Sequence, residues 1–124
     1  MNRSQKAARY GALAEAHARE VYGLSSEHDS WHDHRADDGS PWDSKSAMLS
    51  RRDPRFRLWE GQHRKLASNG GGYVFMGYVP RGDGIEVIET RTVRAQDLRV
   101  DFYGAGSHPK GNQVKVPVGE VLSV

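Results

Sequence analysis

The stretch WHDHRADDGSPWDSK (residues 31–45) decides the fold that this sequence predicts. Residues 31–36 and 40–48 read as two strands joined by the turn Asp37-Asp38-Gly39-Ser40. Asp43 and Lys45 are two residues apart, so a strand presents both side chains on one face. We therefore expect the two side chains side by side: a carboxylate that can bind a metal and a lysine that can contact a phosphate or a water.

The register of this hairpin depends on its turn. A three-residue loop at 37–39, with Gly39 in the left-handed conformation, puts Asp33 directly opposite Asp43. Two facing carboxylates repel, so one keeps its proton unless a cation lies between them. A two-residue turn at 38–39 puts His34 opposite Asp43 instead, and the residues of the turn permit both registers.

Helices are expected on both sides of this hairpin. Residues 4–22 form an Ala-rich helix that ends at Gly23, and Gly11 would let Glu15 sit close to a neighbouring sheet. Residues 53–69 predict a second helix with Asp53-Pro54 at its start. The alternative for this segment is an extended chain up to Trp59 followed by a shorter helix.

The rest of the chain adds strands and loops to this frame. Strands are predicted at 73–79, 85–89 and 113–118, a short helix at 92–99 and a loop at 101–112. With 124 residues, the chain is expected to form one domain over residues 1–124. The order of elements indicates an α/β or α+β sandwich with a helix on each face.

Composition narrows the class of protein. The chain is 27% charged and 36% hydrophobic, and it has no apolar run near the ~18 residues of a membrane span. It has no cysteine, which excludes disulfides and thiolate ligands, and its N-terminus has no secretory signal, so a cytoplasmic protein is expected. Acidic residues are concentrated in residues 27–43 and basic residues in residues 51–65. This pattern is typical of two solvated faces that neutralise each other, and it also suits an enzyme that binds a cation and a polyanion.

Five polar side chains follow one another along the chain in an order that suggests a metal-binding catalytic site. An acid on a small-residue helix, Glu15, precedes Asp33 and the triplet 43–45 in the hairpin, and Gln62 follows in WEGQHRKL ahead of GGGYVF. This set resembles the PD-(D/E)xK nuclease superfamily, in particular its Holliday-junction-resolvase-like and restriction-endonuclease-like branches. The resemblance covers roughly residues 7–79. No proline precedes Asp33, and Asp43 replaces the commoner Glu.

The resemblance implies a restriction-endonuclease-like mixed sheet core flanked by helices, and Mg²⁺- or Mn²⁺-dependent hydrolysis of phosphodiester bonds. Asp33 and Asp43 would bind the metal, with Glu15 and the Ser44 carbonyl as further ligands. Lys45 would position or deprotonate the nucleophile, and Gln62 would orient Lys45 or a water. The implied function is a DNA endonuclease, with branched or junction DNA as one candidate substrate.

Size and charge suggest the partners of such an enzyme. A homodimer is expected because one small domain offers one active site and duplex cleavage needs two. The residues expected to contact DNA phosphates are Arg51, Arg52, Arg55, Arg57, Arg64 and Lys65, with Arg81, Lys110 and Lys115 as further candidates.

Other functions fit the same residues. A non-catalytic nucleic-acid-binding or structural protein could keep this fold. A zinc-binding module could use His28, His32 and His34 with Asp29 or Asp33, although Asp33 would point away from His32 and His34 in a strand. Trp31, Trp42 and Trp59 could stack on bases or pack in the core, and residues 104–107 match no nucleotide-binding pattern.

Overall fold

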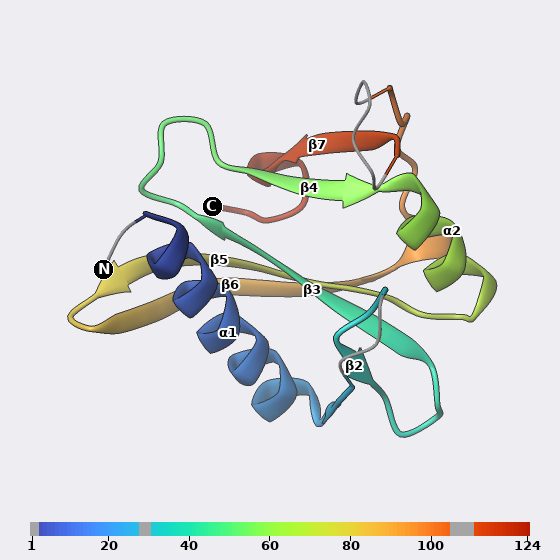
Figure 1. Cartoon of the computed structure of the whole chain (residues 1–124), viewed down its shortest axis with the longest axis horizontal. Helices are drawn as coiled ribbons and strands as arrows, with labels where there is room; N and C mark the ends of the chain where they lie inside the picture. Colours follow the sequence, from blue (N-terminus) through green and yellow to red (C-terminus); the bar gives the residue numbers. More distant parts are fainter. Residues whose placement is uncertain (1–2, 28–30, 105–110) are drawn as a thin grey trace.

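The computed structural model describes residues 3–27, 31–104 and 111–124 (Figure 1). Across these residues a five-stranded mixed sheet has the order β1-β2-β3-β5-β6, and β4 and β7 pair as a separate ribbon. Only β3 and β5 run parallel; the other pairs are antiparallel. The elements of the sheet and ribbon are β1 (Ser25–Ser26), β2 (His34–Arg35), β3 (Pro41–Met48), β4 (Arg55–Trp59), β5 (Gly72–Arg81), β6 (Gly84–Arg94) and β7 (Gln113–Pro117).

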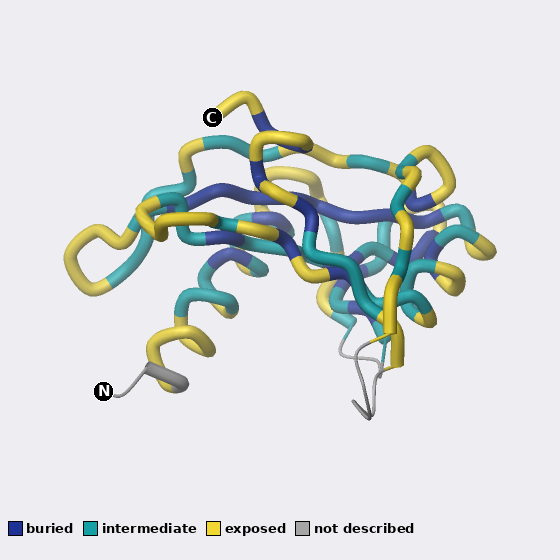
Figure 2. The backbone as a smooth tube through the Cα atoms, turned by 90° about the horizontal axis from the view of Figure 1, so that it is seen from above, coloured by how far each residue is buried: buried dark blue, intermediate teal, exposed yellow. Residues whose placement is uncertain are grey.

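The two faces of the sheet are covered by different elements. Helix α1 (Arg3–Tyr22) lies on one face, where the buried Ala14 and Ala18 contact Val74 and Met76. The other face carries helix α2 (Glu60–Ser68), the ribbon and two 3-10 turns, η1 (Ala95–Asp97) and η2 (Val118–Glu120). Strand β5 lies between the two layers and is buried over most of its length (Figure 2). The predicted sandwich with helices on both faces is therefore confirmed.

The hairpin adopts the three-residue loop. His34 pairs with Trp42 and Arg35 with Pro41, and Gly39 has a φ of 86°. The Ala36 amide donates to the Ser40 carbonyl at 3.0 Å, which closes the loop around residues 37–39. This is the register predicted to set Asp33 opposite Asp43, but the regular ladder begins at His34, and the Asp33 amide donates to the Trp42 carbonyl. The first strand is shorter than the predicted 31–36.

The helix predicted over residues 53–69 is wrong in its first half, and the alternative is confirmed. Residues 55–59 form β4, in which Phe56 and Leu58 face the core and alternate with exposed arginines. The helix begins only at Glu60. Partner strand β7, near the end of the chain, gives this segment the ladder hydrogen bonds that favour strand over helix.

Two smaller expectations also need correction. The predicted helix at 92–99 is the end of β6, which reaches Arg94, followed by the single turn η1. Gly11 is not a close-approach residue, because a Cβ atom built there meets nothing within 4 Å. The tight contact of α1 with the sheet comes from Ala14 and Ala18 instead. No helix in the described ranges is long and apolar enough to cross a bilayer.

Candidate active site

Asp33 and Asp43 form a pair of carboxyl groups at the uncovered edge of β3. The Asp33 amide donates to the Trp42 carbonyl at 3.2 Å, and its Oδ2 accepts the Ser44 amide at 3.3 Å. Asp43 is only 5% exposed. Burial raises the pKa of Asp43 to about 6; Lys45 opposes this shift, whereas the charge and hydrogen bond of Asp33 add to it. Asp43 therefore keeps its proton to a higher pH than an exposed aspartate does.

Lys45 and Gln62 complete this group. The Lys45 Nζ lies 3.0 Å from Asp43 Oδ2 and donates to Gln62 Oε1 at 2.9 Å. The Gln62 Nε2 in turn donates to the Trp31 carbonyl at 2.6 Å. Gln62 thus ties α2, β3 and the segment before β2 together and fixes the ammonium beside Asp43. The structure brings four of the sequence-predicted site residues into contact: Asp33, Asp43, Lys45 and Gln62.

The side chains of two other predicted site residues, Ser44 and Glu15, lie away from this group. Ser44 directs its side chain to the opposite face, where Oγ is 2.5 Å from His34 Nε2. Its carbonyl points to the same edge as its amide, toward Asp33, because the N–H and C=O of one strand residue face the same side. Glu15 is half-buried on α1, which packs on the face opposite Asp43 and Lys45. Among the described residues, no histidine or further acid lies close enough to Asp33 and Asp43 to complete a group of three possible metal ligands. The role of Glu15 as a metal ligand therefore remains a prediction.

An open cleft of about 490 Å³ reaches this group at Lys45; Asp33, Asp43 and Gln62 are not among the residues that line it. Beyond Trp42 no described strand pairs with β3 on the side of β2, so its edge faces the cleft. Figure 1 shows the N-terminal part of α1, the end of β3 and the start of β4 on one side of the molecule. The cleft's polar and charged lining is Ser44, Lys45, Ser46, Arg51, Asp53, Arg55, Arg57, Tyr78 and Lys115.

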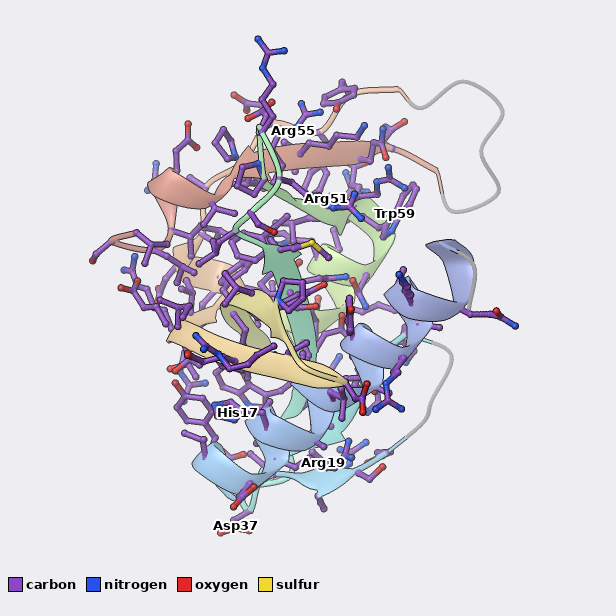
Figure 3. The ribbon with its side chains drawn as sticks, turned by 90° about the vertical axis from the view of Figure 1, so that its left-hand side faces the viewer. His17, Arg19, Asp37, Arg51, Arg55 and Trp59 are labelled. Atoms are coloured by element: carbon purple, nitrogen blue, oxygen red, sulfur yellow. The ribbon has the colours of Figure 1, made fainter. Side chains whose placement is uncertain are left out.

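The cleft separates the predicted phosphate-binding residues into two sets. Arg51, Arg55 and Arg57 line it, whereas Arg52, Arg64 and Lys65 do not. On α2, Arg64 pairs with Glu60 at 3.4 Å and Lys65 lies over the ring of Trp31. Figure 3 shows Arg51, Arg55 and Trp59 toward one end of the molecule, far from His17, Arg19 and Asp37.

Two aromatic neighbours of the site escaped the sequence analysis. Tyr73 pairs in register with Asp43 across the parallel strands, and its hydroxyl hydrogen-bonds His63 Nδ1 at 2.8 Å. Burial, with the nearby Asp43 charge, raises the pKa of the Tyr73 phenol, and burial lowers the pKa of His63. Both rings are thus neutral walls of the site. The only signal was position, since His63 follows Gln62, and strand register cannot be read from sequence.

The histidines do not form the alternative zinc site within the described residues. His32 and His34 are buried; His34 contacts Ser44, and His32 Nε2 lies 3.6 Å from Glu27 Oε1. The Asp33 carboxylate instead accepts the Ser44 backbone amide, and Asp33 lies before the start of β2. His28, Asp29, Lys110 and residues 105–107 lie outside the described residues.

Comparison with known proteins gives one finding. A family model described as a PD-(D/E)XK nuclease superfamily domain matches residues 1–123. No curated protein and no solved structure gives a significant match.

Proposed function

The chain belongs to the PD-(D/E)XK nuclease superfamily, and from this premise we propose that it is a metal-dependent endonuclease that hydrolyses DNA phosphodiester bonds at the edge of β3. The observation that carries the proposal is the group formed by Asp33, Asp43 and Lys45. The buried Asp43 carboxyl interacts with Asp33 and lies 3.0 Å from the Lys45 ammonium, and Lys45 also lines the basic cleft along β3.

The donor set fits a hard divalent cation. Asp33 and Asp43 supply carboxylate oxygens, and the Ser44 carbonyl is aimed at the same edge. Two carboxylates with few other protein ligands suit Mg²⁺ or Mn²⁺, because Mg²⁺ keeps several waters and takes substrate phosphate oxygens as ligands. When bound, such an ion lowers the pKa of a water and neutralises charge on the phosphate.

Lys45 and Gln62 have separable roles in this mechanism. The Lys45 ammonium can donate to a phosphate oxygen and stabilise the negative charge that develops as the bond to the leaving oxygen breaks. Gln62 touches no reacting atom; it positions Nζ by accepting one of its hydrogen bonds. Tyr73 is buried, lies in register beside Asp43 and is held by its hydrogen bond to His63.

The test is cleavage of labelled single-stranded, duplex and four-way-junction DNA with Mg²⁺ or Mn²⁺ and with EDTA. Metal-dependent cutting that Asp43→Ala and Lys45→Ala abolish supports the proposal and identifies the preferred DNA structure. Light scattering with and without DNA tests the expected homodimer. If no DNA is cut and wild type and Asp43→Ala bind DNA equally, the catalytic proposal is wrong and a binding protein on a nuclease fold remains.

A further inference from the structure

The ribbon of β4 and β7 carries a row of basic side chains on its outer face. Phe56 and Leu58 point into the core, so Arg55, Arg57 and Trp59 point outward. On the other strand Lys115 lies directly opposite Arg57 in the register. The row meets the cleft that leads to Lys45, because Arg55, Arg57 and Lys115 all line it.

The facing pair of Arg57 and Lys115 costs the free protein stability. Like charges directly opposite each other on one face of an antiparallel pair are destabilising. In the described part of the chain neither side chain forms an ion pair with an acid. Two unneutralised cations held side by side at the entrance to a cleft are suited to a bound anion.

The active site at the end of this row is recessed. Asp43 is almost fully buried, and the Lys45 side chain is 15% exposed. A single DNA strand can lie along the ribbon and enter the recess. An intact duplex is wider, because its second strand would have to enter the recess as well. Trp59 extends the same row, and Arg57 lies over its ring at 5.8 Å. A basic track beside an aromatic ring is the arrangement that binds single strands, because bases stack on the ring while cations hold phosphates.

We propose that the outer face of the β4–β7 ribbon binds one single-stranded segment of DNA, with Arg57 and Lys115 on its phosphates and Trp59 against a base. This inference rests on the proposed nuclease function and specifies its substrate: DNA that is single-stranded where it enters the cleft. The ribbon then leads that strand to Lys45.

The test is equilibrium binding of a fluorescent single-stranded oligonucleotide and of its duplex, in EDTA, to wild type and to Arg57→Ala/Lys115→Ala. The matched control, Lys6→Ala/Arg99→Ala, removes two exposed cations that do not line the cleft and are not among the expected phosphate contacts. We expect the ribbon variant to bind the single strand at least tenfold more weakly. The slope of log K against log salt should become less steep by about 1.4, since two phosphate contacts with a single strand are lost. Trp59→Ala should weaken binding about tenfold.

A second readout separates binding from folding. Loss of the like-charge pair should leave the Tm of the ribbon variant equal to or above that of wild type. Arg57→Gln/Lys115→Gln provides the same test with longer polar side chains. Equal losses in the ribbon and control variants, or a duplex that binds as tightly as the single strand, would overturn the inference. Ribbon-dependent binding without cleavage would leave it standing and refute only the nuclease proposal.

Discussion

Asp43 is buried beside a second carboxyl group, and this placement opposes folding at neutral pH. Its pKa in the folded protein is about 6, above its ordinary value of 3.8. For a group with a raised folded pKa, stability is full below the unfolded value and is lost as the pH rises through the folded one. The metal-free protein therefore loses stability between pH 4 and pH 6 because of Asp43.

Asp43→Asn should remove that loss. In EDTA at pH 7.5 we expect the variant to be more stable than wild type by roughly 1–3 kcal/mol, and the difference should vanish near pH 4. Urea unfolding at several pH values measures it. Asp101→Asn is the control, because Asp101 is exposed and should show no such trend. A variant less stable than wild type at pH 7.5 contradicts the account.

Gln62 contacts the Lys45 ammonium and the Trp31 carbonyl and is not proposed to touch the substrate, so its loss should appear in the chemical step. Gln62→Ala removes the acceptor that holds Nζ and the donor to the Trp31 carbonyl. We expect kcat to fall 10- to 100-fold with little change in KM. Gln96→Ala, an exposed glutamine in η1, is the control. A rise in KM at constant kcat would assign Gln62 to substrate binding instead.

Glycines at the start of β5 allow the central strand to pack closely. A Cβ atom at Gly71 would lie 1.8 Å from the Pro41 carbonyl oxygen, whereas one at Gly61 in α2 meets nothing within 4 Å. Gly71→Ala should therefore cost about 3 kcal/mol of unfolding free energy. Gly61→Ala should be neutral or stabilising by up to about 1 kcal/mol. Urea denaturation measures both, and equal effects would contradict the packing.

Elements were predictable where the signal is local. The position of the hairpin turn, the Asp43 and Lys45 spacing and strand β5 follow from turn residues, strand periodicity and apolar content. The choice between the two possible loops does not, because the turn residues permit both. Strand β4 did not, because Phe56, Trp59, His63 and Leu66 also recur at helical spacing, and the partner that decides the matter is β7, more than 50 residues away. The face on which α1 packs is likewise tertiary, so sequence could place Glu15 on a helix but not against a particular face of the sheet.

At the scale of the whole molecule, the two faces of the sheet differ in what covers them and in the residues they carry. One face is closed by α1 through small residues, and the other holds the carboxyl pair, Lys45, α2 and the basic ribbon. At the edge of β3 no described strand pairs beyond Trp42. Because the acidic pair lies inside the fold, its charge state is coupled to the stability of the whole domain, and any cation that binds there must stabilise the folded state.

That coupling predicts a pH-dependent stabilisation by metal. Mg²⁺ should raise the Tm, with about 1.4 kcal/mol gained when free metal exceeds its Kd tenfold. The gain should be larger at pH 8 than at pH 5.5, because below the Asp43 pKa of about 6 the metal must displace a proton. Asp33→Asn and Asp43→Asn should each abolish the shift in a thermal melt, and Asp101→Asn should retain it. A shift that persists in Asp43→Asn, or that grows at lower pH, would place the cation elsewhere on the molecule.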